Sequence, residues 1–371
     1  MKRCEAQITA IIPVYNVSQY VGECISSVLN QSYHDFRIII INDGSTDDSW
    51  EKVLQLIRGD KRVTLVSKTN DGLGPTRNLG IRLAETEYVT FLDSDDWWDE
   101  NYIAAMQEGI QKGKNDLVLA DLFCVDGKEN GEYICKPSRL RLPRGNVLLP
   151  KKNLLSRARN FGCGKTFRRS LFIEQNAWFA PHPYEDVSVV PFLTASAKSI
   201  YSVGKPLLYY RRMRQGSIRN DLSTLCYIAI SMEELCDRFK QRGIFDKYYR
   251  DLRQFAWGQY TFVQKWSKSH GGGPEACGDI DKVCFGLFPE LAAFARGRFY
   301  VEDCDGELQA ALSKVLLTAD SFSKNADDAN FIVKFEGNAD AKRFLEVARP
   351  KEALDKETLE WDLAEDIMER L

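Results

Sequence analysis

Two aspartates separated by one residue, Asp93 and Asp95, directly follow the apolar run 88–92. Side chains two residues apart on an extended chain point the same way, so these carboxylates can converge on one hard cation, which prefers oxygen ligands. Such a site suits a diphosphate, whose oxygens complete the coordination shell and whose charge the ion neutralises as it leaves. The alternative is a helix cap or a solvated turn, because aspartates often follow strands.

A third aspartate, Asp43, follows residues 37–41 in the same way. That run contains four consecutive isoleucines, which leave it no polar face and predict a fully buried strand. In an open α/β sheet, ligands bind at the carboxyl ends of the strands. We therefore expect Asp43 and Asp93 to lie at a ligand-binding edge, with a cap on the next helix as the alternative for Asp43.

The elements that position these aspartates are short β-rich runs, which alternate with helical patterns through the first 125 residues. We predict strands over residues 8–12, 37–41, 63–66, 88–92 and 117–123. Such alternation predicts βαβ units, and hence a mainly parallel, Rossmann-like sheet flanked by helices. Helical periodicities dominate after residue 220, so we predict an α/β domain over 1–220 and a mainly helical region over 221–371.

The composition is that of an ordinary globular protein, since 44% of residues are apolar and 28% are charged. The ten cysteines include no C-x-x-C pair, so neither a zinc site nor a disulfide framework is suggested, and we expect reduced thiols. No stretch approaches the roughly 20 apolar residues that a spanning helix needs, and residues 1–10 lack a signal-peptide run. We therefore expect a soluble, cytoplasmic protein.

Charge is distributed unevenly along the chain. Residues 136–170 contain eleven Lys or Arg and no Asp or Glu, whereas residues 351–371 contain eight acidic and three basic residues. A basic field concentrates phosphate-bearing ligands or anionic lipid headgroups. The basic stretch could therefore dock a phosphate-bearing or lipid-linked acceptor at the inner face of the plasma membrane, with a solvated surface as the equal alternative.

Six segments together resemble the inverting nucleotide-sugar glycosyltransferases of family 2, which have a GT-A fold. They are residues 11–16 (IIPVYN), 26–32 (SSVLNQS), 40–47 (IINDGSTD), 72–80 (GLGPTRNLG), 88–97 with the DXD motif, and 184–186 (YED). Each segment is weak alone, but their order and spacing are specific, and they span residues 7–218. The resemblance implies a UDP-sugar donor, Mn²⁺ or Mg²⁺ as cofactor, and transfer of a hexosyl or N-acetylhexosaminyl group to a glycan or lipid-linked saccharide in cell-surface polysaccharide synthesis.

The resemblance also implies which residues bind the donor. These are Pro13, Tyr15, Asp43, Asn70, Arg77, Asp93, Asp95, Arg211 and Ser217. Pro13 and Tyr15 would border the base, and Asp43 would accept a hydrogen bond from a uracil nitrogen. Asn70 and Arg77 would contact the uridine or diphosphate side. Asp95 would ligate the metal, and Asp93 would hold the ribose or help the metal.

Inversion needs one base that removes the proton of the acceptor hydroxyl while the diphosphate leaves from the opposite face. The family's Glu-Asp pair corresponds to Glu185 and Asp186, so the resemblance implies Asp186 as the base and Glu185 as the group that orients it or the acceptor. The alternative is an acidic helix start, where carboxylates favour the helix dipole.

Residues 209–217 resemble a segment that closes over the diphosphate, where forked hydrogen bonds from arginine suit phosphate oxygens. Arg211, Arg212 and Arg214 stay open as the contacting arginine. Lys165 matches a further family segment, although Phe161-Gly162-Cys163 replaces the usual bulky aromatic before it.

Two other enzyme classes are excluded. A dinucleotide oxidoreductase is excluded because residues 72–77 have Arg where the third glycine should be and do not follow the first strand. A sugar nucleotidyltransferase needs a Gly-rich loop after the first strand, where this chain has residues 13–16. The rival that stays open is a non-catalytic GT-A-like binding or assembly module, against which the presence of Asp93, Asp95 and Asp186 argues. Donor sugar, linkage, oligomeric state and the role of residues 221–371 also stay open.

Overall fold

The computed structural model describes residues 6–129, 132–138, 140, 142–148, 154–212, 214, 221–272, 278–289, 291, 298–301, 321–324 and 331–334. The chain divides into two compact units, residues 1–280 and 281–371. The described part of the second unit includes a three-stranded antiparallel sheet in the order β11 (Arg298–Val301), β13 (Phe331–Lys334) and β12 (Ser321–Lys324). Within the described residues, no helix is both long enough and apolar enough to cross a membrane.

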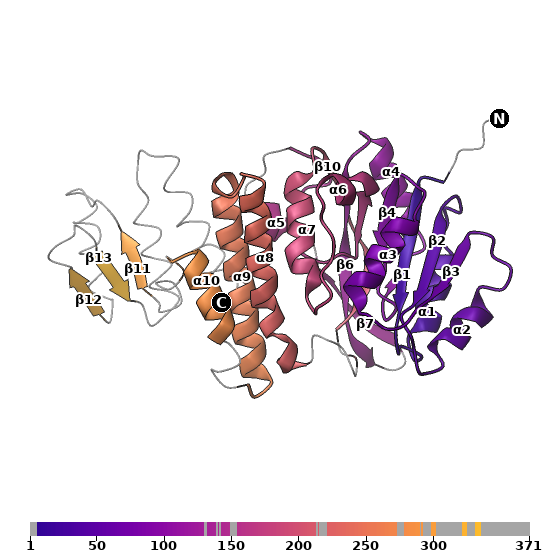
Figure 1. Cartoon of the computed structure of the whole chain (residues 1–371), viewed down its shortest axis with the longest axis horizontal. Coiled ribbons are helices and arrows are strands. Elements are labelled where there is room, and N and C mark those ends of the chain that lie inside the picture. Colours follow the sequence, from indigo (N-terminus) through magenta and orange to yellow (C-terminus); the bar gives the residue numbers. More distant parts are fainter. Residues whose placement is uncertain are drawn as a thin grey trace. The chain divides into compact units, whose positions relative to one another are not determined.

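The first unit is built on a mixed sheet flanked by helices (Figure 1). Its strands are β1 (Ile8–Val14), β2 (Arg37–Asn42), β3 (Val63–Ser67), β4 (Tyr88–Phe91), β5 (Trp97–Trp98), β6 (Leu117–Glu129), β7 (Glu132–Ser138), β8 (Gly145–Val147), β9 (Lys165–Arg168) and β10 (Ile200–Arg211). The main order is β3-β2-β1-β4-β9-β6-β10-β5, with β7 paired to β6 and β8 to β10. The predicted strands are therefore confirmed, and the sheet is parallel where β3, β2, β1 and β4 meet.

Helices connect and cover these strands (Figure 1). Those of the first unit are α1 (Val21–Leu29), α2 (Ser49–Leu56), α3 (Leu73–Leu83), α4 (Tyr102–Gln111), α5 (Leu154–Ala158), α6 (Arg169–Glu174), α7 (Glu185–Ser196), α8 (Cys226–Gln241) and α9 (Tyr249–Ser269), and α10 (Gly278–Leu287) crosses the division between the two units. All seven residues of β1 are buried, as are five of the six in β2. These continuous apolar runs fold into the centre of the sheet because both of their faces are removed from water.

The strand register brings the expected ligand-binding residues to one edge. Val14 pairs with Asn42 at the ends of β1 and β2, and Ile11 pairs with Phe91 in β4. The segments that begin at Tyr15, at Asp43 and just after β4 therefore leave the sheet side by side, as expected for parallel strands.

The α7 and α8 helices pack against each other within the first unit. The rings of Phe192 and Phe239 meet edge to face at 5.5 Å between centroids. The hydroxyl of Tyr248 donates to the carbonyl of Ala195 over 3.1 Å. The division between compact units falls after Ile280, so α8 and α9 belong with the sheet, and the functional boundary at residue 220 stays a prediction.

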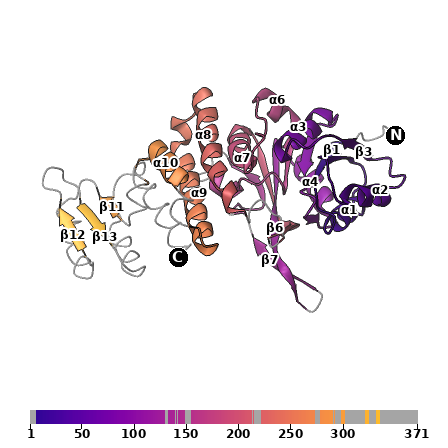
Figure 2. The same cartoon turned by 60° about the horizontal axis from the view of Figure 1, so that its bottom comes forward.

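The long strands β6 and β7 form a hairpin that projects from the rest of the first unit (Figure 2). Its Tyr133 ring lies 4.7 Å from the ring of Trp97, and its hydroxyl donates to Glu23 over 2.8 Å. These contacts anchor the hairpin beside the segment that follows Asp95 and Asp96.

Candidate active site

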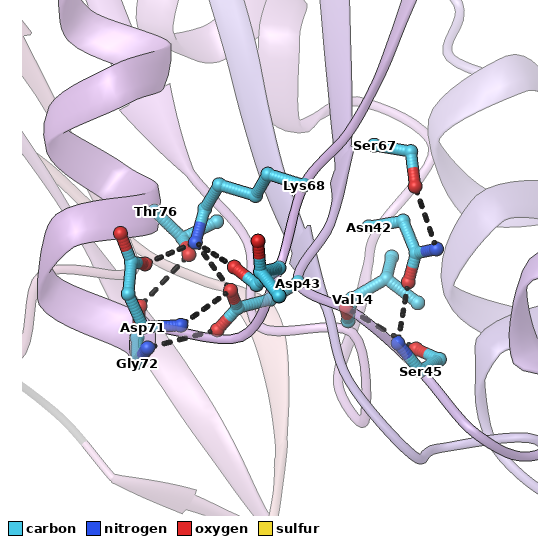
Figure 3. Close-up of polar contacts among 10 residues, drawn as sticks. Val14, Asn42, Asp43, Ser45, Ser67, Lys68, Asp71, Gly72 and Thr76 are labelled. Atoms are coloured by element: carbon cyan, nitrogen blue, oxygen red, sulfur yellow. Dashed lines mark hydrogen bonds and ion pairs between the residues drawn. The ribbon is translucent and has the colours of Figure 1, made fainter.

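The carboxylate of Asp43 organises the loop that carries Asn70. Asp43 is 3% exposed, and its oxygens accept hydrogen bonds from the backbone N–H groups of Asp71 and Gly72, each over 3.1 Å (Figure 3). The ammonium of Lys68 forms ion pairs with both Asp43 and Asp71. A carboxylate offers about four acceptor positions, and among the described residues Oδ2 accepts only from Gly72, so it keeps one position for a ligand.

The backbone beside Asp43 is also tightly constrained. The side chain of Asn42 donates to Ser67 over 3.1 Å and accepts from the N–H of Ser45 over 2.9 Å (Figure 3). Gly44 has a φ of +71°, and a Cβ there would lie 2.9 Å from the backbone nitrogen of Asn70. Glycine is required at this point because any side chain would be both strained and too close to the loop.

Pro13 and Tyr15, the residues expected beside the base, lie in different environments. Pro13 is buried within β1, as the alternative of core packing requires, whereas the ring of Tyr15 just beyond the strand is 46% exposed. Asn70 is exposed too. Tyr15 and Asn70 therefore offer an exposed aromatic ring and an exposed amide at the same strand edge as Asp43.

The guanidinium of Arg77 is buried, with 2% of the residue exposed, and it joins two distant carboxylates. Nη2 donates to Oδ1 of Asp93 over 2.6 Å, and Nη1 pairs with Glu185. Although burial disfavours the charged form, the two carboxylates outweigh it and raise the pKa of Arg77. Arg77 thus connects the end of β4 to the start of α7, and its guanidinium forms ion pairs with a carboxylate at each of these two places.

The three aspartates after β4 lie close enough together to influence one another's ionisation. Burial raises the pKa of Asp95, and Asp93 adds to the rise against the opposing ion pair with Arg214. Asp96 is 1% exposed; burial raises its pKa well above the usual range, and Asp95 and Asp93 raise it further. Its Oδ1 accepts from the N–H of Arg211 over 2.7 Å, whereas Oδ2 has no hydrogen-bond partner in the described part of the chain.

This charge distribution fits a divalent cation. Mutually repelling carboxylates and a buried, unpartnered carboxylate oxygen are both relieved by a positive ion, and oxygen is the donor that Mn²⁺ and Mg²⁺ prefer. Among the described residues, however, no group of three or more His, Cys, Asp or Glu is arranged to hold an ion. Asp93 and Asp95 could therefore supply only part of a coordination shell, which leaves positions for diphosphate oxygens.

The Glu185–Asp186 pair begins α7, and its two members lie in different surroundings. Glu185 is 3% exposed, and burial raises its pKa although Arg77 opposes the rise. Asp186 is half-buried; its pKa is raised to about 8, first by burial and then by Glu185, while Arg77 and Lys165 oppose the rise. A carboxyl with this pKa is mostly protonated near neutral pH. Its carboxylate form therefore has the proton affinity that a general base needs to accept a proton.

Lys165 is a buried cation near Asp186. It is 3% exposed, and its ammonium donates to the carbonyl of Phe161 over 2.6 Å. Burial lowers its pKa to about 7, and the charge of Arg159 contributes, while Asp186 opposes the shift. The sequence indicated Lys165 only through a family segment, because nothing local predicts that a lysine in a strand lies near Asp186.

The three arginines of the segment 209–217 have different partners. Arg211 donates from Nε to the carbonyl of Asp95 over 2.9 Å and from Nη2 to Glu23 over 2.7 Å, and it lies over the ring of Trp97. Arg212 pairs with Asp126. Only Arg214, of the three, contacts the Asp95 carboxylate. Ser217 lies outside the described residues, as does the acidic stretch 351–371.

Two members of the basic stretch 136–170 are paired with acids from elsewhere in the chain. Lys136 lies 3.4 Å from Asp126, and Arg168 lies 3.0 Å from both Glu87 and Asp116. These pairs reduce the positive field that the sequence alone suggests for this stretch.

Comparison with protein families gives a match over residues 9–175 to glycosyl transferase family 2. Glycosyltransferase GlyA of Streptococcus pneumoniae is 35% identical over 127 residues, which are 34% of this chain and 18% of GlyA. The putative glycosyltransferase EpsH of Bacillus subtilis is 27% identical over 259 residues, or 67% of this chain and 73% of EpsH. The match to GlyG, a second S. pneumoniae relative, covers 42% of that protein, so this chain spans less than half of GlyA or GlyG.

Solved structures with a similar fold include S. aureus TarS 1–349 in complex with UDP-GlcNAc. The TM-score is 0.53 at 18% identity, and the match covers 81% of this chain and 95% of the TarS chain. TarS 1–349 in complex with UDP gives a TM-score of 0.51 at 19% identity, over 81% of this chain and 94% of that one. The expected fold is therefore confirmed: a GT-A sheet flanked by helices and followed by helices.

Proposed function

The chain belongs to the family 2 glycosyltransferases, and on that premise we propose that it moves a sugar from a UDP-sugar to an acceptor hydroxyl with inversion. The observation that carries this proposal is the buried bridge in which Arg77 joins Asp93 to Glu185. The bridge supports the proposal because it joins the start of α7, which carries the candidate base Asp186, to the end of β4, where a donor diphosphate would lie. Perturbed carboxyls gathered in this way are typical of catalytic sites.

In the proposed reaction the acceptor oxygen attacks the anomeric carbon as the bond from that carbon to the diphosphate oxygen breaks. The hydroxyl proton passes to the carboxylate of Asp186, and the electron pair of the broken bond leaves with UDP. Glu185, fixed by Arg77, holds the start of α7 in place. Asp186 can accept the proton because its surroundings favour the protonated form, as its pKa of about 8 indicates.

Asp95 and Asp93 would hold Mn²⁺ or Mg²⁺, and the ion would neutralise charge on the diphosphate. Arg214 already contacts Asp95, so its guanidinium is near enough to donate to a diphosphate oxygen. Arg211, which forms an ion pair with Glu23, would act through the backbone carbonyl of Asp95 and the side-chain carboxylate of Asp96 rather than on the donor.

A uridine base would lie between the exposed ring of Tyr15 and the free acceptor position of Asp43. A carboxylate accepts a hydrogen bond from a ring N–H and repels a ring nitrogen that is itself an acceptor, which favours uracil over cytosine. The complex of TarS with UDP-GlcNAc supports a UDP-linked donor with a hexosyl or N-acetylhexosaminyl group.

The proposed acceptor is a glycan or lipid-linked saccharide used in surface polysaccharide synthesis. The glycosyltransferase GlyA and the putative glycosyltransferase EpsH are both bacterial, which supports this class of product. The proposed setting is the cytoplasm, with peripheral contact at the inner face of the plasma membrane through the basic residues between 136 and 170.

The test is a panel of UDP-sugars assayed for UDP release with and without Mn²⁺. We expect one sugar class to give metal-dependent release that increases when acceptor glycans are added. The competing function is a non-catalytic binding or assembly module. Metal-independent UDP binding, or no UDP binding, would favour the module.

A further inference from the structure

A row of side chains on α8 faces the chain segment that leads into Glu185 and Asp186. The row consists of Tyr227, Ser231, Glu234, Arg238 and Arg242, and we call it the α8 stripe. The spacing is four, three, four and four residues, so the stripe follows one face of the helix and of the residue that caps it. Its polar groups therefore point in a common direction.

The stripe contacts a single continuous segment, residues 174–184, and the order of the contacts is antiparallel. Arg242 donates to the carbonyl of Glu174 (2.9 Å), Arg238 to those of Asn176 (3.3 Å) and Trp178 (3.0 Å), and Ser231 to that of Tyr184 (2.9 Å), while Glu234 contacts the ring nitrogen of His182 (3.2 Å). The ring of Tyr227 stacks on His182 at 5.4 Å. Four of these contacts are to backbone carbonyls, so they define the path of the main chain rather than one side chain.

The last contact falls on a strained residue. Tyr184 has φ +59° and ψ +29°, a left-handed conformation that is unfavourable for a residue other than glycine. It immediately precedes Glu185 and Asp186, so the turn that it makes sets the direction in which α7 begins. Ser231, which is fully buried, donates to the Tyr184 carbonyl and offsets part of that strain.

The same segment is fixed from its other side by α3. The side-chain amide of Asn78 donates to the carbonyl of Phe179 over 2.8 Å and accepts from its N–H over 3.0 Å. A Cβ on Gly74 would overlap the carbonyl of Ala180, so α3 approaches the segment at backbone distance. The segment is therefore held between the two helices.

We propose that the α8 stripe is a positioning element for catalysis, which fixes the location of the Asp186 carboxylate relative to the donor site. This proposal rests on the proposed role of Asp186 as the base, and it assigns a function to residues beyond 220. None of the stripe residues contacts the donor site in this proposal. Each acts through the backbone of residues 174–184.

The test compares Ser231→Ala and Arg238→Met with Glu233→Ala in the full chain. Glu233 is exposed on the same turn of α8 and lies outside the stripe, so it is the matched control. The stoichiometry of UDP binding, measured by calorimetry, gives the number of folded sites. Dividing the turnover rate by this number gives kcat per folded site, so unfolded protein does not lower the measured kcat. The pH dependence of kcat/KM is measured for each protein.

We expect kcat per site to fall about tenfold in Ser231→Ala and in Arg238→Met, with the UDP Kd and the donor KM changed less than about twofold. The acid limb of kcat/KM should also move to lower pH, because a displaced Asp186 becomes more solvated. Unchanged kcat and acid limb in both variants would overturn the proposal, as would an equal fall in Glu233→Ala. Asp186→Asn, assayed in parallel, distinguishes failure of this proposal from failure of the proposed function, since full turnover in that variant would show that Asp186 is not the base.

Discussion

The carboxyl of Asp186 is the group whose replacement tests the site most directly. Burial raises its pKa to about 8, and Glu185 adds to the rise, while Arg77 and Lys165 oppose it. At pH 7 about one tenth of such groups are ionised and able to accept a proton. In the free enzyme at neutral pH, most Asp186 carboxyls should therefore be protonated and unable to act as the base.

The expected pH profile follows from that fraction. Wild-type kcat/KM should rise about tenfold per pH unit below pH 8 and level off above it, since kcat/KM reports the base of the free enzyme. Asp186→Asn keeps the shape of the side chain but cannot take the proton, so kcat should fall by about 10²–10⁴. UDP affinity should stay within about twofold of wild type, because the carboxyl faces the acceptor.

The same pKa makes a prediction about stability, with a definite sign. In the unfolded chain an aspartate has a pKa of about 3.9, so between pH 4 and 8 the folded protein holds a proton at Asp186 that the unfolded chain has released. The free energy of unfolding must then decrease as pH rises through this window, by at most about 1.4 kcal/mol per pH unit. Asparagine does not titrate, so Asp186→Asn should become progressively more stable than wild type toward pH 8.

Urea unfolding followed by tryptophan fluorescence at about pH 5.5, 6.5 and 7.5 measures this difference. Asp48→Asn is the matched control, because it makes the same change at an exposed aspartate. A difference for Asp186→Asn that is flat with pH would refute the account of its burial. Wild-type turnover by Asp186→Asn would refute its role as the base.

Three further substitutions test other parts of the site and sheet. Asp95→Ala should remove the part of UDP affinity that depends on Mn²⁺ and leave the metal-independent part, as calorimetry with and without Mn²⁺ can show. Arg77→Met would leave the buried Glu185 carboxylate and the half-buried Asp93 carboxylate without their partner, and urea unfolding should show a loss of about 3–5 kcal/mol. Gly80→Ala would force a Cβ into the side chain of Ile11 in β1, so the free energy of unfolding should fall by about 1–3 kcal/mol, with a matching fall in Tm.

The parallel half of the sheet could be predicted from the sequence because its signals are local. The run of residues 37–41 is apolar on both faces, which suits only a central strand, and the aspartates that follow such runs mark the carboxyl ends. The insertion of β9 between β4 and β6 was not predictable in this way. It has only four residues, and its two antiparallel neighbours begin 77 and 48 positions earlier in the chain, at Tyr88 and Leu117 (165 minus 88 and minus 117).

The site residues divide along the same line. Asp43, Asp93 and Asp95 could be expected at one edge because each follows a strand. The burial of Arg77 depends instead on carboxylates 16 and 108 residues away, at Asp93 and Glu185, and a helical arginine carries no local mark of that. Its structural partners therefore had to be seen before its place between the strand end and α7 could be known.

The sequence pattern changes at residue 220, whereas the division between compact units falls after residue 280. The change from mixed to helical sequence is a property of neighbours along the chain, whereas a compact unit is defined by contacts between distant residues. Helix α8 supplies such contacts: Phe239 packs on Phe192 of α7, and Ser231 holds Tyr184 in its left-handed turn. Without α8, Tyr184 would still be in an unfavourable left-handed conformation but would lose the hydrogen bond from Ser231. The carboxyl of Asp186, two residues later, would then no longer be held in one position.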